Sequence, residues 1–430
     1  MSSAENLWAT KARALDVYRY AVLRQQYGIV VSVFIFVREA VRDAFLGLAA
    51  HFRLALAIST DPCDFLLLEY GPKAIPLERK KLLKQALRER GHVLVETVLP
   101  TTSTILAQRL LKRPSASVPL RYFLYASHAE WLVSRHTPKV LLNDRNGSIF
   151  APFLRLSLNA RRLLLVHLAH ATTVESSLRL SMNDYDYYFL FGQTSLEALQ
   201  KRSLLFGTSK VVLSGSHMID MAYDLPDVLP RNEAILLLGV GPDEEAEDSY
   251  QCIYALLADW ARTHPQERLL IKAHPRSSVP FWQQAVNTLS NLTVLPRSCT
   301  LVEALSQADI VISIWSNAVI EAALARRPVI FTNVAGATDV FDEERFFGTR
   351  IETNAALSAR VQEIRQNYWC HQEASKKFAH FHLAHGFQGL QYSLTYLEAL
   401  LHAEPIPYEI LAERNPQDGC MHTIVTEIGK

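Results

Sequence analysis

Three side chains that can bind phosphate follow one apolar run in the second half of the chain. Lys272, His274 and Arg276 lie within five residues, at the end of the run Leu269 to Ala273. Pro275 fixes its own φ and lacks an N–H, so the strand predicted here ends abruptly and holds His274 at its rim. An imidazole donates a hydrogen bond to a phosphate oxygen and, when protonated, stabilises a departing phosphate. The alternative is a strand that ends in a solvated basic loop.

A second polar turn follows the buried strand predicted over Ile310 to Ser313. Ser316 or Asn317 is expected to begin a helix, since both residue types are good N-caps. The free N–H groups and the positive dipole end of a helix attract anions, and Ser313 and Ser316 add hydroxyl donors. Ser316 could instead only cap its own helix. Glu321, one turn into the helix, suits a ribose-hydroxyl ligand or a carboxylate favoured near the helix start.

Both turns are expected on one parallel sheet, because predicted strands alternate with predicted helices along the chain. The first series of strands is Asp64 to Tyr70, His92 to Val98, Lys139 to Leu142, Leu163 to Leu168, Tyr187 to Phe191 and Lys210 to Leu213. The second series is Ala234 to Gly239, Arg268 to Ala273, Leu292 to Leu295, Ile310 to Ser313 and Pro328 to Thr332. Open α/β sheets bind ligands at the carboxyl ends of their strands, so the pattern predicts two Rossmann-like βαβ domains with a ligand cleft between them.

This pattern predicts four segments and a linker. Residues 1–60 form a helical N-terminal extension, 61–225 a first Rossmann-like domain that binds the acceptor, and 232–400 a second one that binds the nucleotide donor. The last helices of the second domain are allowed to pack back on the first. The proline-containing segment 225–232 is the linker, and the tail 404–430 shows little pattern.

Composition narrows the class of protein. The chain has 430 residues, 49% of them hydrophobic and 20% charged, which is typical of a globular protein. A net charge of +1 gives no field that would attract nucleic acid. The five cysteines are widely spaced without metal-ligand spacing, which favours a reducing, cytoplasmic compartment and no structural zinc.

The N-terminal extension shows no secretory signal. Its apolar segment Ile29 to Val37 is far shorter than the roughly 20 residues of a membrane-spanning helix. A packed helical extension is expected. Peripheral contact with the inner face of a membrane through these helices is the alternative.

The motifs of the second half resemble those of bacterial GT-B glycosyltransferases that build surface polysaccharides, namely polysialyltransferases, Kdo transferases and CDP-glycerol glycerophosphotransferases. The likeness rests on His274-Pro275, on the turn Ser313 to Asn317 and on the run Glu321 to Ile330. Weaker matches upstream extend it over residues 139–332. They are Asn143 to Gly147, Leu163 to His170, Asp186 to Gly192 and Ser214 to Ser216.

This resemblance implies an inverting transfer of a sugar or polyol phosphate from a CMP- or CDP-linked donor to a cell-surface glycan or glycolipid. The donor phosphates would lie at His274, Ser313 and Ser316. Asp144, a partial match to an acidic base, or His170 would activate the acceptor, although Ala171 replaces the glycine that usually follows the histidine. No metal or cofactor is implied beyond the activated donor.

Two other classes stay open. A nucleotide-sugar epimerase shares this architecture but needs acidic catalytic residues, and its Ser/Gly-rich signature is poorly matched by Ser313 to Asn317. A non-catalytic nucleotide-binding protein would keep the phosphate site without a base, which the change at Ala171 allows. The acidic run Asp243 to Glu245 is expected in a solvated loop, with the cleft as the alternative, and His167 in the core.

Overall fold

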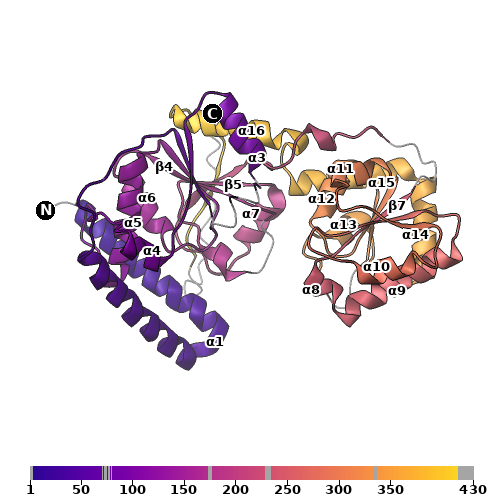
Figure 1. Ribbon diagram of the computed structural model, residues 1–430, viewed down its shortest axis with the longest axis horizontal. Helices are drawn as coiled ribbons and strands as arrows, with labels where there is room; N and C mark the ends of the chain where they lie inside the picture. The colour runs from indigo at the N-terminus through magenta and orange to yellow at the C-terminus, as the bar shows by residue number, and fades with distance from the viewer. Residues whose placement is uncertain are drawn as a thin grey trace. The chain divides into compact units, whose positions relative to one another are not determined.

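The computed structural model describes residues 3–69, 71, 75, 78, 80–172, 177–227, 234–332 and 337–414, with side chains from residue 7 onward (Figure 1). The chain divides into two compact units. Unit 1 comprises Met1–Met218 and Leu390–Lys430, and unit 2 comprises Ile219–Gly389. The cleft expected between the two domains stays a prediction.

Unit 1 contains a seven-stranded sheet with the order β12-β6-β5-β4-β3-β1-β2. Its strands are β1 (Phe65–Glu69), β2 (Leu94–Val98), β3 (Val140–Asn143), β4 (Leu164–Leu168), β5 (Tyr187–Leu190), β6 (Ser209–Leu213) and β12 (Glu409–Leu411). Strands β1 to β6 pair in parallel with one another, as predicted, while β12 pairs antiparallel with β6. The segment expected to lack pattern therefore supplies an edge strand, which is too short for a periodicity to be visible.

Helices cover both faces of this sheet. They are α3 (Lys81–Glu89), α4 (Thr102–Ala107), α5 (Leu120–His136), α6 (Ala151–Asn159), α7 (Gln193–Gln200) and α16 (Gly389–Leu401). Alternate residues of β1, such as Phe65 and Leu67, share a core with Leu87 of α3 and with Leu394 and Leu397 of α16. Figure 1 shows α3 and α16 together at one side of the sheet, although more than 290 residues separate them.

Helix α5 escaped the sequence analysis for a physical reason. Twelve of its 17 residues are buried, polar ones such as Ser127, His128 and Glu130 included, because it packs against the long N-terminal helix α1 (Ser3–His51) as well as inside unit 1. A helix that is buried on every side shows no amphipathic stripe.

Helix α1 folds back on itself at Gly28, whose φ of 72° and ψ of −177° interrupt the helix. Glycine adopts such angles at little cost, so residues 3–27 and 29–51 form the two arms of a hairpin. The second arm approaches α5 so closely at Gly47 that a Cβ atom there would lie 1.8 Å from the Leu120 carbonyl oxygen. Within the described part of the chain, no helix is sufficiently long and apolar to span a membrane.

Unit 2 contains a five-stranded parallel sheet with the order β11-β10-β7-β8-β9. Its strands are β7 (Ile235–Leu238), β8 (Leu269–Lys272), β9 (Leu292–Val294), β10 (Ile310–Ser313) and β11 (Val329–Phe331). Its helices are α8 (Pro242–Glu245), α9 (Asp248–Thr263), α10 (Pro280–Ala285), α11 (Leu301–Ser306), α12 (Ala318–Leu324), α13 (Glu343–Phe347), α14 (Asn354–Gln366) and α15 (Tyr368–His382). The predicted architecture of two α/β sheets with a helical N-terminal extension is confirmed.

Candidate functional site

The His274 turn lies at the carboxyl edge of the unit 2 sheet, directly after β8. Nδ1 of His274 accepts a hydrogen bond from the backbone N–H of Arg276 at 3.2 Å. The neutral ring therefore carries its proton on Nε2, where it can be donated to a ligand. Burial lowers the pKa of His274, the Arg276 charge lowers it further, and Glu244 acts in the opposite sense.

A glycine-containing loop after the central strand β7 faces this turn. A Cβ atom on Gly239 would lie 3.0 Å from the His274 backbone nitrogen, so the two loops touch through their backbones. Gly241 precedes α8, and a Cβ there would lie 2.4 Å from Glu244 Oε2 and 3.9 Å from Arg276 Nη2. Small residues thus leave the backbone accessible beside a histidine and an arginine, which suits an anionic group.

Two side-chain hydrogen bonds hold the residues that follow His274. The Ser277 hydroxyl donates to the Glu245 carboxylate, and Arg297 Nη2 donates to the Ser277 carbonyl oxygen at 3.0 Å. Glu245 is buried at the end of α8, so the expectation of a solvated acidic loop over Asp243 to Glu245 is wrong for this residue. No sequence pattern identifies the Ser277 hydroxyl as the partner of this carboxylate.

The turn after β10 is the second predicted element at this edge. The Ser316 hydroxyl accepts a hydrogen bond from the Ala318 N–H at 3.3 Å and so caps the seven-residue helix α12. Asn317 is exposed and makes no side-chain cap bond. Ser313 is fully buried, and its hydroxyl lies against the Glu343 carboxyl instead of facing solvent.

Two carboxyl groups near this turn favour the protonated form. Burial raises the pKa of Glu321 to about 7 and that of Glu343 to about 8, with the Ser313 hydroxyl opposing the shift at Glu343. Burial raises the pKa of Tyr223, and the Glu321 charge raises it further, so the Tyr223 phenol lies close to the Glu321 carboxyl. A neutral carboxyl donates a hydrogen bond and does not repel a phosphate.

Unit 1 gathers a second polar cluster at the carboxyl edge of its sheet. Glu69 ends β1, Asp144 follows β3, and the two strands are neighbours with Leu68 opposite Asn143. Lys80 donates to Glu69 at 2.9 Å and to Asp144, and all three side chains are buried. Burial and the nearby Asp144 charge raise the pKa of Glu69, while Lys80 lowers it.

His167 is buried in the core beside this cluster, as expected. Its Nδ1 accepts from Asn143 Nδ2 at 2.9 Å, so its Nε2 donates to Asn146 Oδ1 at 2.8 Å. The ring of Tyr185 stacks on it at 4.3 Å. Burial, followed by the charges of His170 and Lys80, lowers the pKa of His167 well below its usual range, and the imidazole stays neutral.

His170 and His217 complete the cluster. His170 is exposed just after β4, close enough to lower the pKa of both His167 and His217. His217 is buried, and burial, Lys80 and His170 lower its pKa to about 3. In the part of the chain that the structure describes, His217 Nε2 has no hydrogen-bond partner. A buried nitrogen without a partner is costly and suits a site that a ligand completes.

The sequence analysis named Asp144 and His170 here but missed Glu69, Lys80 and His217. Glu69 and Lys80 lie in a segment without a motif, and only the pairing of β1 with β3 brings them to Asp144. The weak match Ser214 to Ser216 ends one residue before His217, and this neighbouring histidine was the signal available. In unit 2 the Gly-Val-Gly after an apolar strand, residues 239–241, could have been identified.

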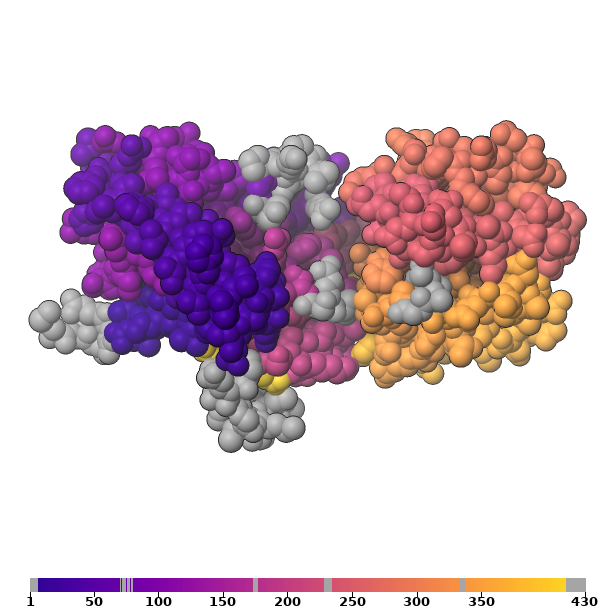
Figure 2. All heavy atoms as spheres, turned by 90° about the horizontal axis from the view of Figure 1, so that it is seen from below, coloured from indigo at the N-terminus to yellow at the C-terminus, as the bar shows by residue number. Residues whose placement is uncertain are grey.

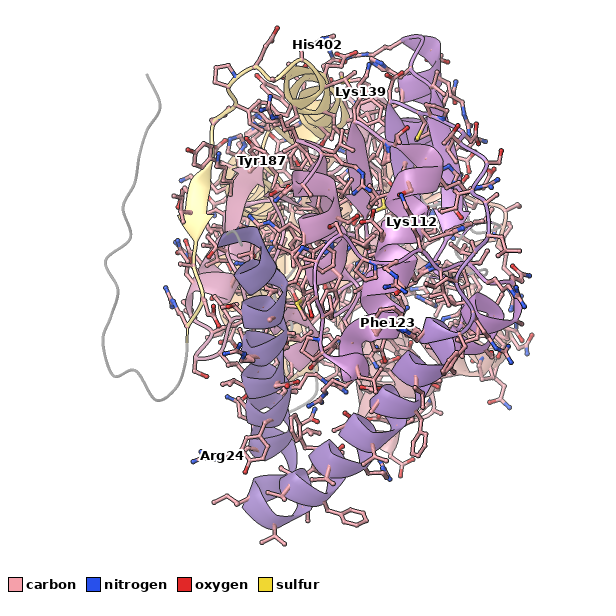
Figure 3. All side chains as sticks on the ribbon, turned by 90° about the vertical axis from the view of Figure 1, so that its left-hand side faces the viewer. Arg24, Lys112, Phe123, Lys139, Tyr187 and His402 are labelled. Atoms are coloured by element: carbon pink, nitrogen blue, oxygen red, sulfur yellow. The ribbon has the colours of Figure 1, made fainter. Side chains whose placement is uncertain are left out.

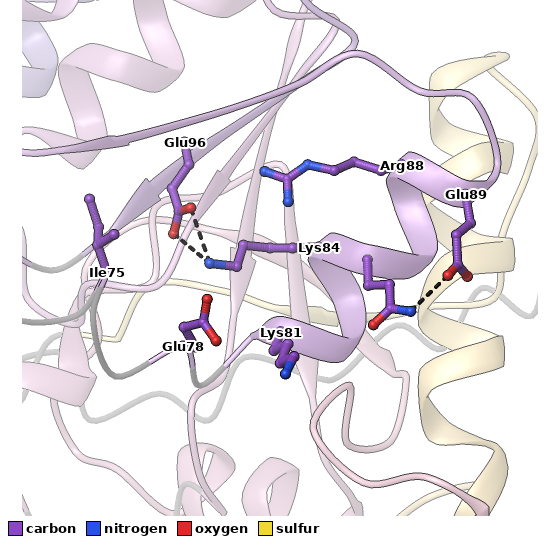
Figure 4. A pocket seen from close by; sticks show the side chains of 8 residues that line it. Ile75, Glu78, Lys81, Lys84, Arg88, Glu89 and Glu96 are labelled. Carbon is purple, nitrogen blue, oxygen red and sulfur yellow. Dashed lines mark hydrogen bonds and ion pairs between the residues drawn. The ribbon is translucent and has the colours of Figure 1, made fainter.

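A separate pocket of about 410 Å³ lies at α3 and β2 and contains no predicted site residue (Figure 4). Three cations and three carboxylates line it together with two uncharged side chains: Ile75, Glu78, Lys81, Lys84, Gln85, Arg88, Glu89 and Glu96. Its positive and negative charges are equal in number, and Lys84 pairs with Glu96 at 3.0 Å, so the wall offers no excess charge to a ligand.

Among the described residues, no group of three or more His, Cys, Asp or Glu side chains could hold a metal ion. The described cysteines Cys63, Cys252, Cys299 and Cys370 are free thiols, while Cys420 lies outside the described residues.

Solved structures share this architecture. A candidate UDP-N-acetylglucosamine 2-epimerase from Listeria monocytogenes matches with a TM-score of 0.51 at 10% identity, covering 80% of this chain and 98% of the other. The S. aureus MnaA–UDP co-structure matches with a TM-score of 0.50 at 12% identity, covering 80% and 99%. MurG from Acinetobacter baumannii gives 0.47 at 13% identity, covering 78% and 99%.

At such identities the likeness shows the fold alone, and the protein is an α/β protein of the GT-B-like fold. No protein-family model matches the sequence, and no curated protein matches it either.

Proposed function

We propose that the protein is a glycosyltransferase that uses a nucleotide-activated sugar or polyol phosphate. The observation that carries the proposal is the approach of the His274 turn to the loop Gly239 to Gly241 at the carboxyl edge of the unit 2 sheet. His274 Nε2 and Arg276 would bind the donor phosphates, with Lys272 beside them. Fold analogy supports a nucleotide, since the similar S. aureus MnaA structure is a co-structure with UDP.

The turn after β10 would bind the rest of the nucleotide. Ser316 and Asn317 reach the surface there, and Glu321 would hold a ribose hydroxyl through a carboxyl that is partly protonated at neutral pH. Ser313 would act through Glu343, because its hydroxyl faces this carboxyl. The donor proposed from the resemblance is CMP- or CDP-linked, and the acceptor is a surface glycan or glycolipid.

Unit 1 would supply the base for an inverting transfer. His170 is the better proposal, since it is exposed, whereas Asp144 is buried in an ion pair with Lys80. Asp144 and Glu69 would then hold Lys80, and His217 would contact the acceptor through the nitrogen that has no described partner. The acceptor oxygen would bond to the transferred group while His170 takes the acceptor proton. The bond from the transferred group to the nucleotide phosphate would break, and its electron pair would stay on the departing phosphate at His274.

The test begins with thermal unfolding in the presence of CMP, CDP, UDP, GDP or TDP. A nucleotide that binds only the folded protein stabilises it by ~2.7 kcal/mol at a hundredfold excess over Kd. We expect one nucleotide to raise the Tm of the wild type and of His380→Ala, an exposed histidine of unit 2, but not that of His274→Ala. No shift with any nucleotide would overturn the proposal.

Turnover separates a transferase from a binding protein. Release of nucleotide from CMP-sialic acid, CDP-glycerol and UDP-N-acetylglucosamine is measured with glycan acceptors present. His170→Ala is expected to keep the thermal shift and to lose turnover by a factor of about 10² to 10⁴. Binding without turnover in the wild type would instead identify a non-catalytic nucleotide-binding protein.

A nucleotide-sugar epimerase is the second candidate, favoured by the buried carboxylate pair Glu69 and Asp144. Inversion of a ring carbon requires a proton to leave and return, so the reaction in D₂O without acceptor would place deuterium on the sugar. Deuterium in the recovered UDP-N-acetylglucosamine, absent with Glu69→Gln, would support the epimerase. Unlabelled sugar and acceptor-dependent nucleotide release would support the transferase.

A further inference from the structure

The second arm of α1 carries an exposed row of apolar side chains, here named the apolar stripe. It consists of Val30, Phe34, Val37, Val41, Phe45 and Leu48. Intervals of three and four residues place them on one face of the helix, over roughly 27 Å. Val30 is 82% exposed, Phe34 71% and Phe45 69%. A face with this many exposed large apolar residues indicates an interaction surface.

The opposite face of the same arm packs against the protein. Glu39, Asp43 and Gly47 each lie two residues after a member of the stripe, which is about 200° around the helix. Arg19 of the first arm donates to Asp43 at 2.8 Å and to Glu39 at 2.9 Å, and Gly47 contacts Leu120 of α5. The stripe therefore lies on the side of the arm that faces away from these packing contacts, and its exposure needs another reason.

The turn of the hairpin extends this apolar surface. Tyr27, Ile29, Val31 and Val33 are exposed around Gly28. Figure 3 shows the two arms converging at the lower end of the view, with Arg24 beside the turn. The indigo atoms of the hairpin lie at the surface on the face drawn in Figure 2. The hairpin that carries this apolar surface thus projects from the rest of unit 1.

The charges around this surface are positive. Arg24 and Arg38 are exposed at either side of the turn, and neither makes an ion pair with a described residue. Residues 17–38 include no Asp or Glu. The two acidic residues of the second arm, Glu39 and Asp43, face Arg19 on the packed side. Exposed apolar residues flanked by arginines complement an anionic, apolar surface.

We propose that the α1 hairpin binds the surface of a membrane that contains anionic phospholipids. The apolar stripe and the turn enter the headgroup region, and Arg24 and Arg38 contact lipid phosphates. The helix lies on the bilayer, since among the described helices none is apolar and long enough to span it. This proposal goes beyond the proposed reaction and uses none of its residues.

A second copy of the chain is the less favourable occupant. A two-fold pairing of the stripe places the same residues of both copies along one seam. The exposed Arg38 of each copy would then lie beside that seam, while the two carboxylates of this arm, Glu39 and Asp43, already pair with Arg19 on the packed side. Phospholipid phosphates offset these charges, so charge complementarity favours the membrane.

Vesicle co-sedimentation of the full-length protein tests the proposal without nucleotide, so the result is independent of the reaction. The wild type is expected to sediment with phosphatidylcholine vesicles containing phosphatidylglycerol, and less with phosphatidylcholine alone. Val30→Ser/Phe34→Ser/Phe45→Ser should bind more than about a hundredfold more weakly. Arg24→Gln/Arg38→Gln should lose about fivefold per arginine and lose the preference for anionic lipid.

Val93→Ser/Met221→Ser/Trp369→Ser removes three exposed apolar side chains elsewhere and should bind like the wild type. Circular dichroism and Tm check that the stripe variant folds, which its exposed positions favour. Absence of wild-type sedimentation at every phosphatidylglycerol content would overturn the proposal, as would undiminished binding by the stripe variant. A third result would assign the stripe to a second copy of the chain: the wild type is a dimer in light scattering and does not bind vesicles, while the stripe variant is a monomer.

Discussion

Lys80 and Asp144, 64 residues apart in the chain, are joined by a buried hydrogen-bonded ion pair at the carboxyl edge of the unit 1 sheet. Lys80 also pairs with Glu69, so one ammonium group holds two carboxylates. Three ionisable side chains in so small a volume must compensate one another, because a buried charge without a partner is expensive.

Lys80→Met is therefore expected to destabilise the protein by ~3–5 kcal/mol, since it leaves Glu69 and Asp144 buried without their cation. Urea denaturation followed by circular dichroism measures the change. Lys81→Met, at the exposed neighbouring position, is the matched control and should shift the midpoint little. Equal midpoints for the two variants would contradict the buried ion pair.

The pKa of Glu343, raised to about 8 by burial, predicts a pH dependence of stability in unit 2. Between the unfolded value of ~4.3 and 8, the folded carboxyl keeps a proton that the unfolded chain releases. Its contribution to stability is complete below the unfolded pKa and is lost as pH rises through the folded pKa. The loss amounts to about 1.4 kcal/mol per pH unit.

Glu343→Gln removes this titration and keeps the shape of the side chain. The stability of this variant relative to the wild type should therefore rise between pH 5 and pH 8, measured by urea denaturation at each pH. The stability of Glu373→Gln, a substitution at an exposed site on α15, should change with pH in the same way as that of the wild type. A constant difference across the range would show that Glu343 is ionised in the folded protein.

Gly207 and Gly91 have the same φ of 83° but different neighbours. A Cβ on Gly207 would lie 2.5 Å from Cβ of Asp184, which is fully buried and paired with Lys11 and Arg155, whereas Gly91 has no atom within 4 Å. Gly91→Ala should cost ~1–2 kcal/mol for the backbone conformation alone. Gly207→Ala should cost ~1–3 kcal/mol more because of the clash. Thermal and urea unfolding compare the two, and similar losses would argue against the close packing at Asp184.

Ser277→Ala tests whether the buried bracing of the His274 turn positions a ligand group. The substitution removes the hydroxyl that donates a hydrogen bond to Glu245. Binding of the nucleotide identified by thermal shift should weaken about tenfold. Calorimetry measures Kd, and Ser278→Ala at the exposed next position is the control. A fall in stability with unchanged Kd would assign Ser277 and Glu245 a structural role only.

Much of the fold could be predicted from local patterns. Strands such as Ile310–Ser313 and Leu269–Lys272 are short apolar runs bounded by polar turns, and their buried positions match that composition. The sequence also located the His274 turn, because Pro275 ends its strand wherever the strand lies in the sheet. These features depend on neighbours along the chain.

The site in unit 1 depends on neighbours in space. β1 pairs with β3 as well as with β2, so β2 becomes the edge strand and Glu69 comes to lie beside Asp144. Similarly, His217 joins Lys80 and His170 only after β6 has taken its place in the sheet. Hydrophobic periodicity predicts which residues are buried, whereas the strand order determines which buried residues contact one another. The sequence alone thus determined the elements and the histidine turn, and the tertiary structure decided which charges share a site, because that choice rests on contacts between distant segments.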